Sequence, residues 1–276
     1  MVQLSAAPAA NVFAHGRNRV TYQLLAGREI DEALDFGCGG AEFARALGRE
    51  LGLVVHACDI NAELIGKLDQ LQTGVHFFAI AEDRPELPLA DGQVSAITCC
   101  DVLEHMPPRS RSHALAEMRR VLAEDGILVL TTPHRSPLSW ADPENVKFNF
   151  PRLHKAVYLV AKGRARYQAR YGGERYGNFT EGAEKHMHFS ATELSEMLSS
   201  AGFEVDEVRY FRLFYPFVRT LLWASESLAG RVPGGRAFRR AMWRAYTWDA
   251  DLEPGRLGDS IAIRARKTRG PAPAAY

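Results

Sequence analysis

Residues 33–47, with the sequence ALDFGCGGAEFARAL, constrain the fold more than any other stretch of the chain. A short apolar run ends in Asp35, three glycines follow within the next five residues, and apolar residues then recur at helical spacing. A strand, a glycine turn and a helix in this order form the first unit of a nucleotide-binding α/β domain, because small residues let the backbone approach a ligand closely. The stretch therefore predicts a ligand site at the end of the first core strand.

Two carboxylates indicate which ligand this site binds. Asp35 ends the strand, and Glu42 stands where a dinucleotide site would carry its third glycine. A pyrophosphate binds at the N-terminus of such a helix, so both acids would repel it. S-adenosylmethionine (SAM) carries a sulfonium, an ammonium group and no phosphate, and it suits this charge pattern. An NAD-dependent oxidoreductase is the less favoured alternative.

A further acid stands at the end of the second core strand. Asp59 follows the apolar run at residues 53–58 and lies 24 residues after Asp35. Nucleotide folds place a carboxylate there on the ribose hydroxyls. An ordinary acid at a strand end is the alternative, but the glycine loop at this spacing favours ribose binding.

The order of the predicted elements indicates an α/β fold. Five apolar strands alternate with helices up to residue 132, which implies a parallel, doubly wound sheet. Ser190 and Glu193 form a capping box that starts a helix, and strands follow at residues 203–210 and 260–266. We therefore predict a mostly parallel, seven-stranded sheet with helical cap insertions.

The same pattern divides the chain into a core and several additions. The predicted divisions are an N-terminal helical segment (1–28), a core (29–132, 190–210 and 259–268), cap insertions (133–189 and 211–258) and a disordered tail (269–276).

Composition limits the classes of function. The formal net charge is +1, and no nucleic-acid-binding module is recognisable, so we expect no nucleic-acid partner. The four cysteines show no CxxC spacing, which argues against a zinc or disulfide framework and fits a reducing cytoplasm. The N-terminus lacks a basic region followed by an apolar run, and no window reaches 18 apolar residues. We therefore expect neither a signal peptide nor a membrane span, and a cytoplasmic location.

Six motifs occur in order between about residues 30 and 210: ALDFGCGG, HACDIN, LPLADG, CCDVLEHMPP, GILVLTTP and HFSATELSEMLSSAGFEV. The series resembles the Rossmann-like class I SAM-dependent methyltransferases. It is most similar to the branch with a D/E-x-x-E-H segment after the fourth strand, which includes the ubiquinone-biosynthesis O-methyltransferases. The resemblance implies a methyltransferase with SAM as its cofactor.

The resemblance also implies a role for each residue of the SAM site. Asp35, Gly37 and Gly39 would hold the methionine end, Asp59 the ribose, Ile60, Ala81 and Glu82 would lie near the adenine, and Cys100 would lie beneath the sulfonium. One departure is Ile80, where many relatives carry an acid.

Methyl transfer from a sulfonium needs alignment of the acceptor and exclusion of water more than acid–base chemistry. A hydroxyl acceptor still gains from a base, and His105 and His186 are the candidates. Two alternatives remain for this segment. Asp101, Glu104 and His105 with His186 and His188 could hold a divalent metal, or Glu104 and His105 could only brace the loop. We assign no metal.

The insertions carry the signals for the acceptor. Seven Lys or Arg and one acid lie between residues 152 and 175, residues 214–224 are almost wholly apolar, and residues 236–248 alternate basic and aromatic positions. Three interpretations compete: a cap that only packs on the sheet, a cap that binds a small-molecule or lipid-like acceptor, and peripheral contact with an anionic membrane. We predict a SAM-dependent methyltransferase acting on oxygen. The alternative is a non-catalytic SAM-binding scaffold protein of the same fold.

Overall fold

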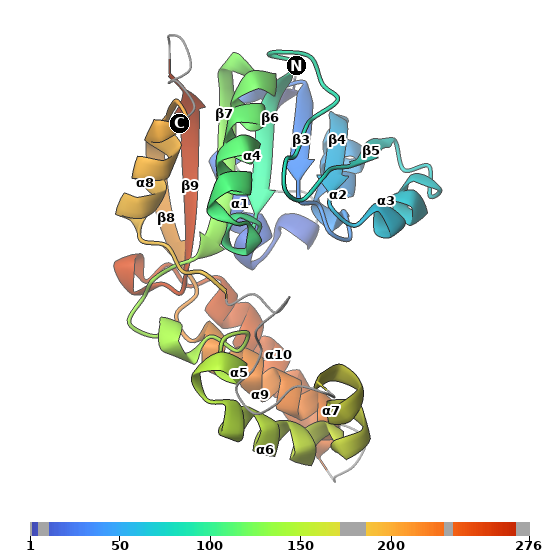
Figure 1. Ribbon diagram of the computed structural model, residues 1–276, viewed down its shortest axis with the longest axis vertical. Coiled ribbons are helices and arrows are strands. Elements are labelled where there is room, and N and C mark those ends of the chain that lie inside the picture. Colours follow the sequence, from blue (N-terminus) through green and yellow to red (C-terminus); the bar gives the residue numbers. More distant parts are fainter. Residues whose placement is uncertain (1, 5–10, 172–185, 229–233, 269–276) are drawn as a thin grey trace.

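The computed structural model describes residues 2–4, 11–171, 186–228 and 234–268. Its centre is a seven-stranded sheet with the order β5-β4-β3-β6-β7-β9-β8 (Figure 1). Only β9 runs opposite to the other six strands, which confirms the predicted mostly parallel α/β sheet. The strands are β3 (Glu32–Phe36), β4 (Val54–Asp59), β5 (Val75–Ala79), β6 (Val94–Cys100), β7 (Leu122–Pro133), β8 (Phe203–Phe211) and β9 (Ser260–Lys267). A separate two-stranded sheet pairs β1 (Val2–Gln3) with β2 (Glu29–Ile30).

Helices cover both faces of the seven-stranded sheet. Leu115 of α4 (Pro108–Val121) and Leu198 of α8 (Ala191–Ser200) belong to the hydrophobic core on one face. Leu24 of α1 (Gly16–Leu25), Leu47 of α2 (Glu42–Leu51) and Leu68 of α3 (Ala62–Asp69) belong to the core on the other. Burial of apolar side chains on both faces explains why the core strands read as apolar runs rather than as alternating patterns.

Local signals place the element boundaries to within a few residues. The capping box at Ser190 and Glu193 is formed in both directions, as predicted. The fifth core strand, β7, pairs with β9 as far as Pro133, one residue beyond the predicted core boundary at residue 132. The first helix ends at Leu25, and Gly27 adopts a positive φ of 77° in the following turn.

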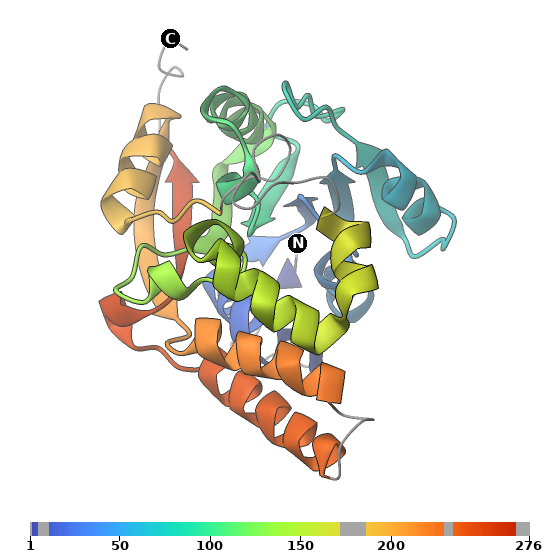
Figure 2. The same cartoon turned by 60° about the horizontal axis from the view of Figure 1, so that its bottom comes forward.

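Both insertions lie beyond the carboxyl ends of the parallel strands (Figures 1 and 2). The first contains η3 (Ser139–Ala141), α5 (Val146–Asn149), α6 (Pro151–Lys162) and α7 (Arg164–Tyr171), and the second contains α9 (Tyr215–Leu228), α10 (Gly235–Ala250) and η4 (Gly255–Leu257). The Trp140 ring contacts the rings of Phe150 and Phe217, with centroids 6.2 and 6.3 Å away, so aromatic packing joins the two insertions. We call this helical layer the cap.

Two predicted features fall outside the described residues. They are the tail at residues 269–276 and the part of the basic segment that lies within residues 172–185. Within the described ranges, every helix is too short or too polar to cross a bilayer.

Candidate functional site

The glycine turn after β3 lies close to its neighbouring strands. The backbone amides of Gly37 and Cys38 donate to the Cys58 carbonyl at the end of β4, at 2.8 and 2.9 Å. Gly37 has a φ of 76°, and a Cβ atom there would lie 2.3 Å from Val102 Cγ2. Glycine is therefore required at this position by backbone conformation and by space.

Asp59 is placed directly over this turn. Its carboxylate accepts a hydrogen bond from the Gly39 amide at 3.0 Å and another from the Asn61 amide at 2.9 Å. The glycine turn and Asp59 thus lie side by side, because the parallel strands β3 and β4 end at the same edge of the sheet.

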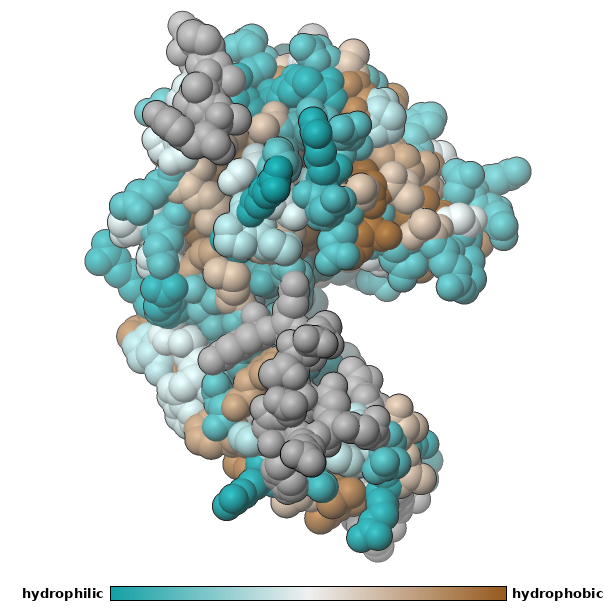
Figure 3. Space-filling view, in the orientation of Figure 1, coloured by the Kyte–Doolittle hydropathy of each residue, from teal (hydrophilic) through white to brown (hydrophobic). Residues whose placement is uncertain are grey.

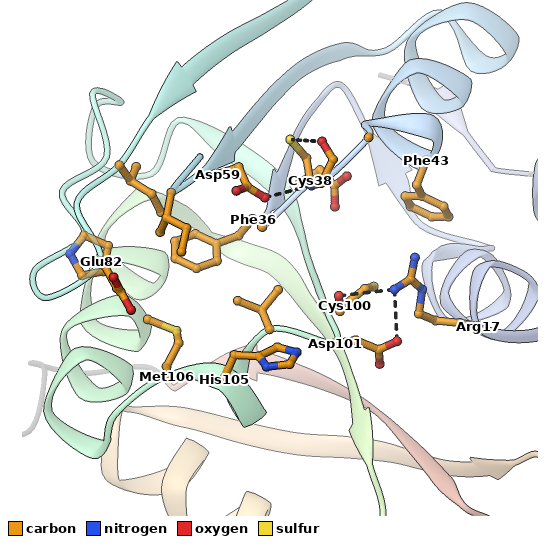
Figure 4. A pocket seen from close by; sticks show the side chains of 18 of the residues that line it. Arg17, Phe36, Cys38, Phe43, Asp59, Glu82, Cys100, Asp101, His105 and Met106 are labelled. Carbon is orange, nitrogen blue, oxygen red and sulfur yellow. Dashed lines mark hydrogen bonds and ion pairs between the residues drawn. The ribbon is translucent and has the colours of Figure 1, made fainter. Parts of the chain in front are cut away.

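A cleft of about 1540 Å³ opens at this edge, and we call it the SAM cleft (Figure 4). Figure 3 shows the molecule hollowed between the sheet and the cap. All ten residues that the sequence assigned to a site line this cleft: Asp35, Gly37, Gly39, Asp59, Ile60, Ala81, Glu82, Cys100, His105 and His186. The fold thus brings together residues that lie up to 151 positions apart in the sequence. The role of each residue stays a prediction.

The floor of the cleft favours a cationic ligand. Asp35 is buried and accepts a hydrogen bond from Thr98 Oγ1 at 2.7 Å. Burial raises the pKa of Asp35 to about 6, and the nearby charge of Asp59 adds to this effect. A ligand cation beside these two carboxylates would stabilise the ionised form of Asp35.

Arg17 is a residue of the cleft that the sequence analysis missed. It lies on α1, and its Nη1 donates to Asp101 Oδ2 at 3.1 Å and to the Cys100 carbonyl at 3.5 Å (Figure 4). Although burial alone would raise the pKa of Asp101, the charge of Arg17 helps to lower it below its usual value. Arg17 precedes the glycine turn by about twenty residues and belongs to no motif, so only the fold reveals it.

A carboxylate from the cap orients the candidate base. Asp142 Oδ2 lies 3.2 Å from His186 Nδ1 and 3.1 Å from His188 Nε2. The rings of His186 and His105 are in contact, with centroids 4.6 Å apart. Burial alone would lower the pKa of His186, but the hydrogen bond and charge of Asp142 raise it above its usual value. Asp142 was not identified from the sequence, because it lies 44 residues before His186.

The residues considered for a metal do not converge on one point. Asp101 pairs with Arg17, while His186 and His188 pair with Asp142. Across the described ranges, no group of three or more His, Cys, Asp and Glu side chains is placed to hold a metal ion. The structure gives the metal alternative no support.

Glu104 is buried, with 2% of its surface exposed, and lies beside this histidine cluster. Its Oε2 accepts a hydrogen bond from Thr132 Oγ1 at 3.1 Å, and its Oε1 has no hydrogen-bond partner within the described part of the chain. Burial, and then the charge of Asp101, raises the pKa of Glu104 well above its usual value. The native state therefore retains a proton that the unfolded chain releases above about pH 4.5.

We expect Glu104→Gln to remove this pH dependence. The wild-type protein should lose stability as the pH rises from about 4.5 toward the raised pKa, whereas an amide does not ionise. The variant should therefore be more stable than wild type at pH 8, by a margin that shrinks toward pH 5. Urea unfolding at pH 5 and pH 8 measures the difference, with the exposed Glu63→Gln on α3 as control. Equal pH slopes for Glu104→Gln and wild type would contradict this account.

A second cavity of about 930 Å³ continues from the SAM cleft into the cap, and we call it the cap cavity. Both insertions contribute apolar side chains to its lining, namely Trp140, Phe150, Leu153, Val157, Phe217 and Leu221. Asp101, His105 and His186 line both cavities. A cofactor in one cavity and a second molecule in the other would therefore meet at these side chains.

Known proteins resemble this chain over most of its length. Residues 11–208 match the family model described as "Methyltransferase domain". The ubiquinone biosynthesis O-methyltransferase of Xanthomonas axonopodis pv. citri (strain 306) is 29% identical over 182 residues, which cover 63% of each chain. That of Escherichia coli O139:H28 (strain E24377A / ETEC) is 32% identical over 113 residues, 40% of this chain and 45% of the relative. The chain thus spans less than two thirds of the length of these relatives.

Solved structures share the fold at low sequence identity. A putative methyltransferase from Bacillus halodurans C-125 superposes with a TM-score of 0.51 and 20% identity, over 91% of this chain and 98% of the other. The cyclase SpnF superposes with a TM-score of 0.52 and 18% identity, over 91% of this chain and 82% of the other. Because one of these proteins is a cyclase, the fold alone does not specify the reaction.

Proposed function

Because this chain belongs to the class I SAM-dependent methyltransferases, we propose that it transfers the methyl group of SAM to an oxygen atom of a small-molecule or lipid-like acceptor. The observation that carries the proposal is the continuity of the two cavities at His105 and His186. One cavity has the charge pattern of a SAM site, and the other offers an apolar space beyond the candidate base.

The donor would lie across the ends of β3, β4 and β6. The carboxylate of Asp35 and the turn at Gly37 and Gly39 suit the ammonium group of the methionine end. The guanidinium of Arg17, at the same end of the cleft, suits its carboxylate. Asp59 would turn from the Gly39 amide to the ribose hydroxyls.

The remaining residues of the SAM cleft suit the other parts of the donor. Ile60 is 56% exposed on the cleft wall, where an adenine ring would cover it. Ala81 and Glu82 line the same wall, and Cys100 lies where the sulfonium would approach the acceptor. Ile80 is nearly buried and carries no hydrogen-bonding group, so the adenine amino group would use Glu82 or the backbone.

His186 is the residue that we assign as base. Its Nδ1 is engaged by Asp142, so Nε2 can take the proton of an acceptor hydroxyl while Asp142 stabilises the resulting imidazolium. When bound, SAM would supply an activated methyl group for the acceptor oxygen, and His186 would hold the proton that this oxygen gives up. His105, in ring contact with His186, would help to position it.

The lining of the cap cavity supports an acceptor with an apolar body. Six apolar side chains line this cavity, whereas the residues that it shares with the SAM cleft are polar or charged: Asp101, His105, Glu144, Lys147, Tyr171 and His186. An amphiphile would therefore bury its apolar part in the cap and present its hydroxyl to His186. The names of the O-methyltransferase relatives also favour oxygen as the methylated atom.

Methyl-labelled SAM tests the proposal directly. We expect the protein to bind SAM and to transfer the label to compounds in a lipid extract, each gaining the mass of one CH2 group. Asp59→Ala should weaken SAM binding by roughly 10- to 100-fold, because a charged hydrogen-bond partner is lost. SAM binding without labelled product would favour the scaffold alternative. Tighter binding of NAD than of SAM would favour the oxidoreductase.

A further inference from the structure

Exposed apolar side chains concentrate in the cap. Of the sixteen large apolar residues that are exposed within the described ranges, thirteen belong to the two insertions. Six of these line the cap cavity and are explained by it. Three others, Phe238, Trp243 and Trp248, lie on α10 and line neither cavity. Exposed aromatic residues gathered on one element indicate an interaction surface.

The same helix carries an ordered row of positive charge. Arg236, Arg240 and Arg244 are four residues apart and all exposed, so they form a stripe along the outer side of α10. Trp243 and Trp248, 47% and 59% exposed, flank this stripe. No Asp or Glu occurs between residues 235 and 248. We call these five side chains the α10 face.

The α10 face does not serve the stability of the helix. Like charges four residues apart destabilise an isolated helix by a few tenths of a kcal/mol. Among the described residues, no ion pair joins the three arginines to an acid. The first acid of the helix, Asp249, is buried and accepts hydrogen bonds from the backbone amides of Leu213 and Phe214. The stripe is therefore available to an anionic partner.

We propose that the α10 face docks on the anionic headgroups of a lipid bilayer. Arginines bind lipid phosphates, and tryptophans prefer the boundary between headgroups and acyl chains. With arginines central and tryptophans at the margins, the contact is shallow and depends on salt. A helix of 16 residues is about 24 Å long and can lie flat on such a surface.

This position connects the membrane to the cap cavity. α10 packs along α9 (Figure 2), and Phe217 and Leu221 of α9 line the cavity. A bilayer against α10 would therefore lie one helix away from the proposed acceptor site. The inference rests on the proposed function for its purpose, namely the delivery of a lipid-like acceptor, but the docking itself requires no SAM.

Co-sedimentation with vesicles tests the docking. We expect the full chain to bind vesicles of phosphatidylglycerol and phosphatidylcholine in low salt, to bind pure phosphatidylcholine vesicles at least about tenfold more weakly, and to be released by high salt. The double variant R240Q/R244Q should bind the anionic vesicles about tenfold more weakly than wild type. Arg49→Gln, at an exposed site of α2 in the core, should bind like wild type.

Three outcomes would overturn the docking: equal binding to both vesicle types, no binding to either, or equal losses in R240Q/R244Q and Arg49→Gln. Calorimetric titration of R240Q/R244Q with SAM, at wild-type affinity, verifies that this variant is folded. Because the vesicle assay contains no SAM, its failure is separate from failure of the methyl-transfer assay. Vesicle binding without methyl transfer would uphold the docking and reject the proposed function.

Discussion

Replacing Gly37 by alanine is expected to abolish SAM binding. The new Cβ would lie 2.3 Å from Val102 Cγ2, and the φ of 76° disfavours any residue with a side chain. Overpacking and left-handed strain together should cost about 2–5 kcal/mol, either as lost stability or as displacement of the turn. Since this turn faces the methionine end of the ligand, SAM affinity should fall by at least about 100-fold in calorimetric titration.

Gly40→Ala is the matched control within the same turn. Gly40 is exposed, its φ is not positive, and a Cβ there would have no protein atom within 4 Å. We expect this variant to unfold within about 0.5 kcal/mol of wild type, as surface substitutions usually do. If Gly37→Ala bound SAM as tightly as the wild-type protein, the turn would not be the donor site.

The donor half of the site could be predicted from the sequence because its signals are local. Asp35, the glycines and Asp59 each follow directly from an apolar strand, and parallel strands bring their carboxyl ends together. The same reasoning predicted the α/β class and the capping box of α8. Hydrophobic periodicity and caps act over a few residues, so one sequence is enough to identify them.

The residues that the cap and α1 contribute to the site could not be predicted in the same way. Asp142 meets His186 across 44 residues, and Arg17 meets Asp101 across 84. Neither pair has a fixed spacing, because the cap and α1 reach the cleft through tertiary packing. The sequence placed Asp101 in a possible metal-binding set, whereas in the structure Arg17 and Thr131 donate hydrogen bonds to its carboxylate. Only the three-dimensional structure shows which hydrogen-bond or ion-pair partner each charged side chain has.

The largest effect on catalysis is expected at His186. His186→Gln retains a hydrogen-bonding side chain but removes the base, and general base catalysis contributes about 10²- to 10⁴-fold. We expect kcat to fall by this factor with little change in SAM affinity, measured as release of labelled product and by calorimetry. In the wild type, kcat should rise with pH through the raised pKa of His186, because only the neutral imidazole accepts a proton. Asp142→Asn should shift this limb to lower pH, because the charge that raises the pKa is lost.

The variant His188→Gln distinguishes a catalytic role of His186 from a purely structural role of the Asp142 cluster. His188 binds the same oxygen of Asp142, at 3.1 Å, but lines neither cavity. If Asp142 and its two histidines only fix the cap to the core, both substitutions should destabilise the protein and reduce kcat to a similar degree. If His186 is the base, His188→Gln should retain kcat within about threefold and keep the pH limb, since only His186 reaches the acceptor. Equal losses of kcat in the two variants would therefore exclude His186 as the base and leave the cluster a structural role.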